Sequence, residues 1–246
     1  MSYLQSPAYT DAEVAELYDV LNPWDAGDDF YLDLVMRAGA VLDVGCGTGA
    51  ILKRARAEGH TGRLVGVDPD PAMLAVARRG PDIAWHESTA AAMPWDAAFD
   101  LALMTGNAFQ CLVGDDDLAA SLTAIRRALR DGGTFAFDTR NPAAREWEDW
   151  HHGTPMEVID PAGRELRISY EVLDVTGDVV TLTETTGDRD GRPLRVDEGR
   201  LRFLDPDTLA AALTAAGFAV EARYGGWDGR PFAAASRQVV VIARTT

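Results

Sequence analysis

The sequence predicts an α/β fold: a doubly wound, mostly parallel seven-stranded sheet with an inserted antiparallel β-sheet. Between residues 40 and 138, short apolar runs alternate with longer amphipathic segments, which is typical of parallel strands joined by helices. Between residues 156 and 204, runs rich in Val, Ile, Thr, Leu and Tyr are separated only by short turns, as in antiparallel hairpins. Because the strand–helix alternation resumes after residue 205, we expect the hairpins to be an insertion within a single domain, 1–246.

The first half of the chain supplies the parallel part of the sheet. An apolar run bounded by glycines, such as 40–44, suits a strand that is buried on both faces. The strands expected in this half are 40–44, 63–68, 83–86, 99–104 and 134–138. The helices expected are 11–21, 28–37, 51–58, 71–79 and 115–130, and the sequence Asn22-Pro23-Trp24-Asp25 separates the first two.

The second half carries the insertion and the end of the sheet. Turns are expected at 160–163, 176–178 and 188–193, followed by a helix at 205–216 and strands at 218–224 and 237–243. The expected parts are an N-terminal helical segment, 1–38, a core, 39–150, the inserted antiparallel sheet, 154–204, and a closing helix with two strands, 205–246.

Composition limits the possible partners. The chain of 246 residues is 47% hydrophobic and carries a formal net charge of −16, which opposes both phosphate backbones and anionic lipid. We therefore expect no nucleic acid and no membrane as partner. The N-terminus lacks the basic and apolar regions of a signal peptide and no run is long enough to span a bilayer, so we expect a cytoplasmic protein. Cys46 and Cys111 show neither a disulfide framework nor zinc-type spacing, and no metal site is expected.

A glycine-rich loop, Asp43 to Gly49, follows the first expected strand and precedes a helix. Its glycines allow a sharp turn that brings backbone N–H groups close to a ligand, and the helix N-terminus adds further donors. Asp68, at the end of the second strand, suits a ribose diol. Gly45, Gly47 and Ala50 also satisfy the dinucleotide form G-x-G-x-x-G/A, so the loop alone fits a nicotinamide dinucleotide or S-adenosylmethionine.

Asp43 separates these two cofactors. Its carboxylate, two residues before the first glycine, opposes a pyrophosphate and favours a ligand with a sulfonium and an ammonium group. The run Asp43–Gly49 resembles the D-x-G-x-G-x-G loop of class I S-adenosylmethionine-dependent methyltransferases at every fixed position. Four further segments resemble motifs of that family: 65–69 with Met73-Leu74, 92–95 with 99–101, 129–133 with Asp131 in place of the usual proline, and 213–218. The likeness covers residues 40–140 and 205–245.

The resemblance implies a Rossmann-like fold and a set of cofactor-binding residues. The implied residues are Asp43, Gly45, Cys46, Gly47, Thr48, Gly49, Asp68, Pro69, Met73, Ser88, Thr89, Ala90, Met104, Thr105, Gly106, Tyr18 and Trp24. In this family the third strand often ends in an acid that contacts the adenine amine, and Glu87 and Thr89 are the candidates here. The family also implies that residues 1–38 form a lid over the cofactor, and a helix-face position in the core is the alternative for Tyr18.

Polar residues after the fourth and fifth strands are expected to line the substrate pocket, because ligands of such sheets bind at the carboxyl ends of the strands. The candidates are Asn107, Gln110, Asp138, Arg140 and Asn141. A helix cap is the alternative for Asn107, and a structural ion pair for Arg140. His151, His152 and Arg140 are the only candidates for a catalytic role, and a pair of surface histidines at a helix end is the alternative for the first two. The loop 227–232 either closes over substrate or caps the sheet edge.

The family resemblance implies transfer of a methyl group to a nitrogen, oxygen or carbon atom of a small molecule. Since the methyl group is already activated by the positive sulfur, alignment and exclusion of water matter more than a general base. The inserted sheet resembles insertions that cover the active site or form a homodimer in small-molecule methyltransferases. Two alternatives remain at this point: a nicotinamide-dependent oxidoreductase, and a non-methylating enzyme that binds S-adenosylmethionine, such as a cyclase.

Overall fold

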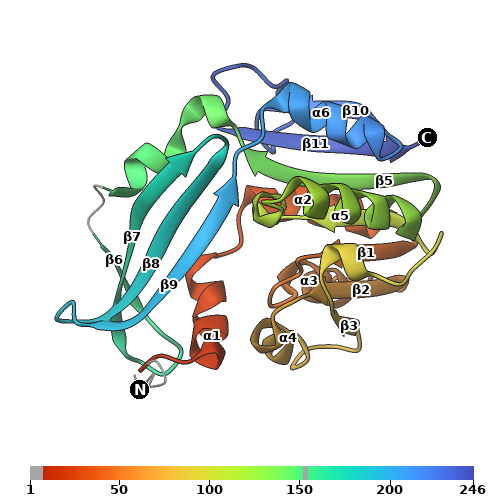
Figure 1. The fold of residues 1–246 in the computed structure, drawn as a ribbon. Helices are drawn as coiled ribbons and strands as arrows, with labels where there is room; N and C mark the ends of the chain where they lie inside the picture. The colour runs from red at the N-terminus through yellow and green to blue at the C-terminus, as the bar shows by residue number, and fades with distance from the viewer. Residues whose placement is uncertain (1–7, 152–154) are drawn as a thin grey trace.

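The computed structural model describes residues 8–151 and 155–246 and contains the two predicted sheets (Figure 1). Within those residues the larger sheet has seven strands in the order β3-β2-β1-β4-β5-β11-β10. Their bounds are β1 Ala40–Val44, β2 Arg63–Asp68, β3 Ala84–Glu87, β4 Phe99–Met104, β5 Leu129–Arg140, β10 Phe218–Tyr224 and β11 Gln238–Thr245. Neighbours from β3 to β5 run parallel, whereas β11 is antiparallel to both β5 and β10. The predicted fold class is confirmed.

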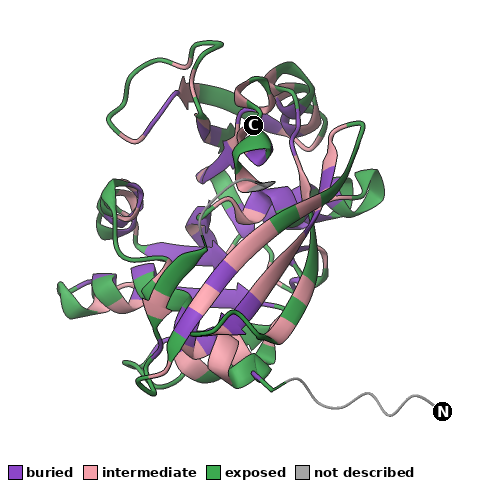
Figure 2. Ribbon diagram, turned by 90° about the vertical axis from the view of Figure 1, so that its left-hand side faces the viewer, coloured by how far each residue is buried: buried purple, intermediate pink, exposed green. Residues whose placement is uncertain are grey.

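Helices cover both faces of this sheet, as the apolar strands require. Helices α5 (Asp115–Ala128) and α6 (Pro206–Ala215) pack on one face around Leu42, Ala102 and Phe137. Helices α2 (Ala26–Arg37) and α3 (Ala50–Ala57) pack on the other face around Val41, Leu103 and Ala136. Alternate residues of the central strands therefore enter two different cores, and Figure 2 shows these strands mostly buried.

The inserted sheet is antiparallel in the order β6-β7-β8-β9. Its strands are β6 Met156–Ile159, β7 Glu165–Thr176, β8 Val179–Asp188 and β9 Pro193–Arg202, and all three predicted turns are present. One face of the sheet is apolar. There Leu166 and Ile168 pack on helix α1 (Asp11–Leu21), while Val180 packs on Trp147 and Phe203. The insertion therefore closes over one side of the core rather than standing apart from it (Figure 1).

Several element ends differ from the prediction for local reasons. Helix α2 begins at Ala26 because Asp25 caps it and forms a reciprocal capping box with Asp28. Helix α5 ends at Ala128, two residues early, because Leu129 already pairs with Phe99 in the sheet. The remaining elements are the short helices α4 Pro71–Ala77, η1 Ala90–Ala92, η2 Ala108–Cys111, η3 Pro142–Ala144 and η4 Glu146–His151. None of the helices in the described ranges is both long and apolar enough to cross a membrane.

Candidate active site

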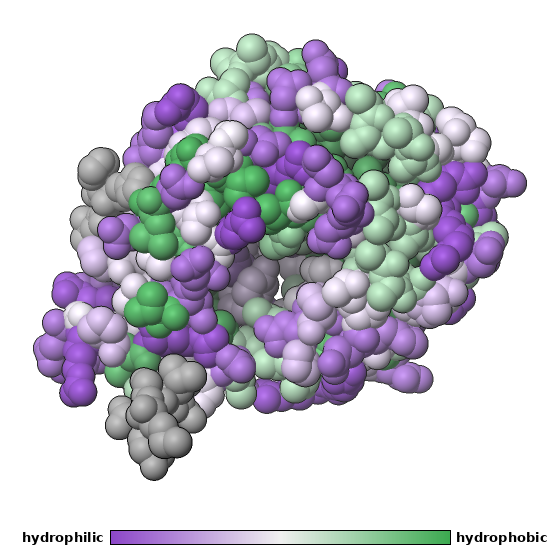
Figure 3. Space-filling model, in the orientation of Figure 1, coloured by the Kyte–Doolittle hydropathy of each residue, from purple (hydrophilic) through white to green (hydrophobic). Residues whose placement is uncertain are grey.

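A cavity of about 620 Å³ lies at the carboxyl ends of β1, β4 and β5. Its wall comes from the glycine loop, the turn after β4, the end of β5, the segment from Tyr18 to Asp28, and Trp227 of the β10–β11 loop. The space-filling view shows the surface hollowed in the middle, between the inserted sheet and the core (Figure 3). The cavity therefore lies where sheets of this type bind ligands.

The glycine loop adopts a backbone that favours glycine. Gly45, Gly47 and Gly49 have φ values of 72°, 53° and 77°, in the left-handed region. Gly49 has a second constraint, because a Cβ there would lie 2.2 Å from Cη2 of Trp85. Gly49 is also the N-cap of α3 and makes no side-chain cap, so the loop leads into a helix N-terminus with free backbone donors.

Two carboxylates lie at the carboxyl ends of the neighbouring strands β1 and β2. Asp43 is 2% exposed, and its Oδ1 has no hydrogen-bond partner among the described residues. Burial and, secondly, the neighbouring Asp68 raise the pKa of Asp43 to about 7. Asp68 accepts N–H bonds of 2.8 Å from Gly47 and Asp70, and burial raises its pKa too. A cationic ligand group would offset the repulsion between these two carboxylates. Each Asp68 oxygen accepts one N–H bond and has a second lone pair that can accept a hydroxyl hydrogen.

Helix α1 covers the glycine loop. A Cβ on Gly47 would lie 3.8 Å from Cε1 of Tyr18, and a Cβ on Gly106 would lie 3.9 Å from the Tyr18 hydroxyl. The ring of Tyr18 therefore spans from the glycine loop to the turn after β4. The Thr48 hydroxyl donates a 2.5 Å hydrogen bond to Asp19 on the same helix. Tyr18 thus belongs to the site rather than to the core.

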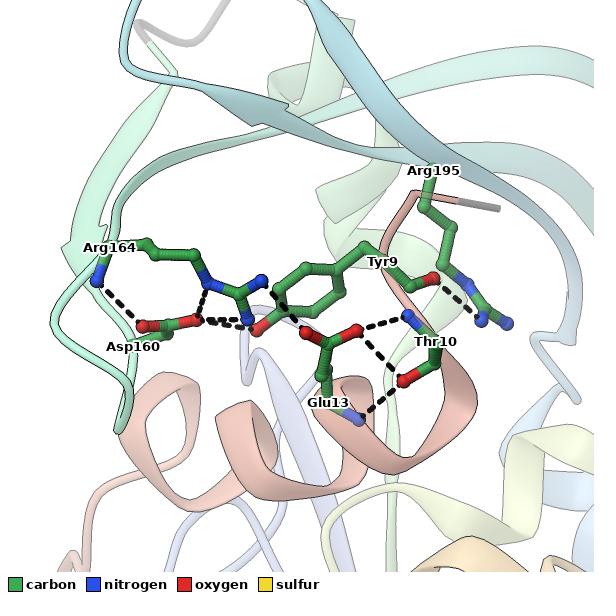
Figure 4. A network of polar contacts seen from close by, with 6 residues as sticks. All are labelled: Tyr9, Thr10, Glu13, Asp160, Arg164 and Arg195. Atoms are coloured by element: carbon green, nitrogen blue, oxygen red, sulfur yellow. Dashed lines mark hydrogen bonds and ion pairs between the residues drawn. The ribbon is translucent and has the colours of Figure 1, made fainter. Parts of the chain in front are cut away.

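The opposite side of α1 is bound to the inserted sheet (Figure 4). Arg164 pairs with Glu13 at 2.8 Å and with the buried Asp160 at 2.6 Å. The Tyr9 hydroxyl also donates to Asp160, at 3.4 Å. Arg195 pairs with Asp11 at 2.6 Å, on the first turn of the helix. Helix α1 is consequently a bridge between the glycine loop and the insertion.

Asp138 organises the other end of the cavity. It is fully buried; Oδ1 accepts a 2.8 Å bond from the Tyr31 hydroxyl, and Oδ2 accepts a 2.9 Å bond from the Asn107 N–H. Burial raises the pKa of Asp138 to about 6, although the bonds from Tyr31 and Asn107 act in the opposite direction. The carboxylate holds the turn after β4 in place, with Asn107 in the left-handed region at φ 61°.

Arg140 lines the cavity but is already paired. Its Nη1 donates to Gln110 at 2.7 Å, its Nε lies 3.1 Å from Glu146, and its guanidinium stacks on Trp150. Gln110 is fully buried and its other amide end donates to the Arg202 carbonyl of the insertion. The ion pair that the sequence left open for Arg140 is therefore present, and Gln110 joins the insertion to the core.

The structure brings about half of the predicted cofactor residues to the cavity wall. Those that line it are Asp43, Gly45, Cys46, Thr48, Thr105, Gly106, Tyr18 and Trp24. Gly47 and Asp68 adjoin it through their mutual hydrogen bond, and Gly49 ends the loop. Outside it lie Pro69, Met73, Ser88, Thr89, Ala90 and Met104. Ser88 continues the edge of the sheet, because its N–H donates to the Asp68 carbonyl.

The predicted substrate residues divide in the same way. Asn107, Asp138 and Arg140 line the cavity, whereas Gln110 and Asn141 do not. Asn141 donates to the carbonyls of Ala234 and Ser236 at 3.0 and 2.7 Å, so its amide holds the β10–β11 loop instead. The backbone of His151 ends η4 and its side chain is not described, while His152 lies outside the described residues.

Sequence reasoning missed several residues of the wall. Asp19, Asp28 and Tyr31 line the cavity, and so does Trp227, for whose loop the sequence leaves two roles open. Tyr31 lies within the helix expected at 28–37, and nothing in the local sequence signals its bond to Asp138. The capping box of Asp25 and Asp28 was a usable signal that this segment is ordered.

The fold and the site define a doubly wound α/β protein with an acidic, glycine-lined cavity at the carboxyl ends of its strands, and comparisons with known proteins specify its class. A methyltransferase domain family model matches residues 41–133. The cypemycin N-terminal methyltransferase of a Streptomyces species is 29% identical over 206 residues, 82% of this chain and 81% of that protein. The 2-phytyl-1,4-naphtoquinone methyltransferase of Thermosynechococcus vestitus is 30% identical over 173 residues, 64% of this chain and 75% of that protein.

A solved structure extends the likeness to the whole chain. The amino pentose methyltransferase of calicheamicin biosynthesis from Micromonospora echinaspora, with S-adenosylmethionine bound, superposes with a TM-score of 0.69 and 24% identity. The match covers 100% of this chain and 99% of that one. This protein belongs to the class I S-adenosylmethionine-dependent methyltransferases. Its cofactor is S-adenosylmethionine, and the nicotinamide alternative is set aside.

Proposed function

We propose that this methyltransferase acts on a small molecule that binds at the Asn107–Asp138–Trp227 end of the cavity. The observation that carries the proposal is the continuity of this end with the glycine loop in one cavity of about 620 Å³. A space of that size suits a small ligand rather than a polymer. Relatives named for a peptide N-terminus, a naphthoquinone and an amino pentose support a small acceptor without selecting its atom.

The residues at the glycine-loop end fit S-adenosylmethionine. The unpartnered Oδ1 of the buried Asp43 suits a cationic amine, and the backbone donors after Gly49 suit a carboxylate. Asp68 is placed one strand further along the edge and suits the ribose hydroxyls. When bound, the cofactor supplies a methyl group on a positively charged sulfur.

The elements around the cavity would promote methyl transfer by orienting the cofactor and the acceptor and by excluding water. We propose that α1, with Tyr18 over the glycine loop, acts as the lid, and that the inserted sheet closes the acceptor end through Gln110 and η4. Fixed walls of this kind hold donor and acceptor in line, which is the main requirement of a reaction with an activated methyl group. The paired Arg140 would then shape the pocket rather than exchange a proton.

Calorimetric titration with adenosylhomocysteine tests the cofactor site. We expect the parent protein to bind it, and Asp68→Ala to weaken binding by about tenfold or more because two charge-assisted hydrogen bonds are lost. Asp131→Ala is the matched control, since that carboxylate is fully exposed near the start of β5. Equal affinity of both variants, or binding of NADH in place of adenosylhomocysteine, would contradict the proposal.

A thermal-shift screen of metabolites in the presence of adenosylhomocysteine then identifies the acceptor class. Compounds that raise the melting temperature are incubated with S-adenosylmethionine, and mass spectrometry tests for the gain of one methyl group. A small-molecule product supports the proposal. Formation of a cyclised product without a gain in mass would favour the non-methylating alternative.

A further inference from the structure

The loop between β10 and β11 brings Trp227 to the acceptor end of the cavity. Strand β10 runs parallel to β5, because β11 is antiparallel to both, so this loop lies at the same carboxyl edge as Asp138. In the strand order, β5 is two strands from β1, which carries Asp43, and three from β2, which ends at Asp68. At about 4.8 Å per strand, the end of β5 is roughly 10 Å from Asp43 and roughly 14 Å from Asp68. A group at the end of β5 is therefore separated from the cofactor groups that Asp43 and Asp68 are proposed to bind.

The indole of Trp227 lies beside the buried pair of Tyr31 and Asp138. All three residues line the cavity, and the Tyr31 hydroxyl donates to Asp138 at 2.8 Å. Burial and, secondly, Asp138 raise the pKa of Tyr31, whereas the indole N–H acts in the opposite direction, which places the indole next to the Tyr31 hydroxyl. The indole nitrogen makes no hydrogen bond of normal geometry among the described residues. Packing, and not a hydrogen bond, therefore holds the ring of Trp227 in place.

Gly27 provides the space in which this ring lies. A Cβ on Gly27 would lie 3.0 Å from Cε2 of Trp227 and 2.9 Å from Oδ1 of Asp25, which caps the helix. The φ of Gly27 is not positive, so the backbone there does not require glycine. Glycine inside a helix costs about 1 kcal/mol relative to alanine. The close approach of the indole and the cap therefore accounts for a glycine in the first turn of α2.

The loop that carries Trp227 is fixed to the sheet. The amide of Asn141, directly after β5, donates to the Ser236 carbonyl at 2.7 Å. Within the loop, the Gly225 N–H donates to the Arg230 carbonyl at 2.9 Å, which closes the loop on itself. A loop held in this way presents Trp227 as a wall of fixed position.

The polar groups at this end of the cavity are mostly bonded to other protein groups. Asp138 accepts hydrogen bonds from the Tyr31 hydroxyl and the Asn107 N–H, and Arg140 pairs with Glu146 at 3.1 Å. Shape is therefore the main basis on which this end can distinguish acceptors. A fixed ring discriminates through the clash that it imposes on a larger compound.

We propose that Trp227 determines acceptor specificity, because its indole closes the acceptor end of the cavity and limits the size of the compound that fits. This inference rests on the proposed function and adds to it the residue that sets the size of the acceptor. The acceptor is a compact molecule whose body ends against the indole ring. Gly27 and Asn141 are positioning residues, because they act on the acceptor only through Trp227.

Trp227→Gly and free indole test this role together. The thermal-shift screen of metabolites, with adenosylhomocysteine present, is run on the parent, on Trp227→Gly, and on Trp227→Gly with saturating indole. We expect the variant to bind larger compounds that the parent rejects, each raising the melting temperature by about 2 °C or more. Indole should refill the space that the side chain leaves, as apolar ligands refill engineered cavities, and should abolish this gain.

Trp95→Gly is the matched control. Trp95 is also a partly buried indole, packed on Phe99, but it does not line the cavity. Its removal leaves a vacancy of the same size elsewhere, so this variant should not bind the compounds that Trp227→Gly gains. Binding of the same compounds by Trp95→Gly would show that they enter any indole-sized space, and would overturn the inference.

Trp227→Phe keeps the inference testable if Trp227→Gly does not fold. This variant retains a ring against Gly27 and removes only the second ring, so it should bind part of the same set of larger compounds. The inference is overturned if the Trp227 variants that fold bind only what the parent binds, or if indole leaves the gain of Trp227→Gly unchanged. A loss of about tenfold or more in adenosylhomocysteine affinity would also overturn it, by placing the indole at the cofactor. Failure of the parent protein to bind adenosylhomocysteine at all is a different result and refutes the proposed function.

Discussion

The hydroxyl of Tyr31 donates a 2.8 Å hydrogen bond to Oδ1 of Asp138, although the two residues are 107 positions apart in the chain. The bond joins helix α2 to the end of β5 at the floor of the cavity, and both residues are almost fully buried. It removes part of the desolvation cost of the Asp138 carboxylate, whose pKa burial raises to about 6. The N-terminal segment and the acceptor end of the site are thereby one hydrogen-bonded unit.

Tyr31→Phe tests the energetic weight of that bond. The substitution leaves the ring in place and removes one donor to a buried carboxylate, so we expect a loss of about 1–3 kcal/mol in the free energy of unfolding at pH 8. The loss is expected to shrink at pH 5, where Asp138 is largely protonated. Urea denaturation at both pH values measures it. An equal effect at both values would show that the bond to the carboxylate is not the cause.

The pH dependence of stability follows from the two most perturbed acids of the site. Burial and, secondly, Asp68 raise the pKa of Asp43 to about 7. Burial raises that of Asp138 to about 6 against the hydrogen bonds from Tyr31 and Asn107, and both values lie well above the ordinary 3.8. Acids whose folded pKa is raised contribute stability below their unfolded pKa, and this contribution is lost as the pH rises through the folded pKa. We therefore expect the urea midpoint of the ligand-free protein to fall as the pH rises from 5 to 8.

Asp43→Asn isolates the larger of these two contributions. The amide has nearly the same shape and no charge, so at pH 8 we expect the variant to be more stable than the parent by about 1–3 kcal/mol, since one pKa unit corresponds to about 1.4 kcal/mol. The difference should shrink as the pH falls through 7 and disappear only below the unfolded pKa of 3.8. Parallel pH profiles of the two proteins would show that Asp43 does not carry an unfavourable buried charge.

The glycine loop and Asp68 were predictable because their requirements are local. Positive φ at Gly45, Gly47 and Gly49 is a property of the loop itself, and Asp68 follows from its place at the end of a strand. The succession of strands and helices was predictable for the same reason, since apolar spacing is set within each element. Errors in the fold are confined to element ends, where a cap or a pairing partner decides the last residues.

The acceptor end was harder to predict because its contacts join distant segments. Asn141 and Gln110 are polar residues after the right strands, yet their amides are taken up by carbonyls 95 and 92 positions further on, at Ser236 and Arg202. Tyr31 enters the site only because α2 packs on the sheet so that the Tyr31 hydroxyl reaches Asp138 at the end of β5. Residue type and strand position identify candidate ligand-binding residues at the carboxyl edge of the sheet. Hydrogen bonds from segments distant in the sequence determine which of these side chains remain free to bind a ligand.

Gly49→Ala tests whether the loop needs glycine for space as well as for conformation. A Cβ at this position meets Trp85 at 2.2 Å in addition to the strain of φ 77°. We expect a loss of about 3 kcal/mol or more in the free energy of unfolding. Gly59→Ala is the matched control, with φ 93° and no atom within 4 Å of the new Cβ, and should cost about 1–2 kcal/mol.

Trp85→Leu in the Gly49→Ala background separates the two causes further. The smaller side chain removes the indole atoms that the new Cβ meets, so the double variant should cost less than the sum of the single changes. Urea denaturation of the four proteins gives this coupling directly. Strict additivity would mean that only the backbone strain of Gly49 matters.

Arg164→Met tests whether the inserted sheet holds helix α1, the proposed lid, in place. The guanidinium pairs with Glu13 and with the buried Asp160 and stacks on the Tyr9 ring at 4.8 Å, so the change releases the first turn of α1 from the β6–β7 turn (Figure 4). We expect faster amide hydrogen exchange across residues 11–21, because their docking is weakened on one side. Adenosylhomocysteine should reverse part of this increase, because bound ligand beneath Tyr18 holds α1 from the other side.

Arg189→Met is the matched control for this experiment. Arg189 also belongs to the inserted sheet, in the turn between β8 and β9. Its side chain is 72% exposed, and its ion pairs with Glu165 and Asp190 are 3.8 Å long. Exposed pairs of that length contribute little, so exchange in α1 should remain at the parent rate. If Arg164→Met also leaves exchange in 11–21 unchanged, α1 is held by the glycine loop alone, through Thr48 and Asp19, and the insertion does not govern the lid.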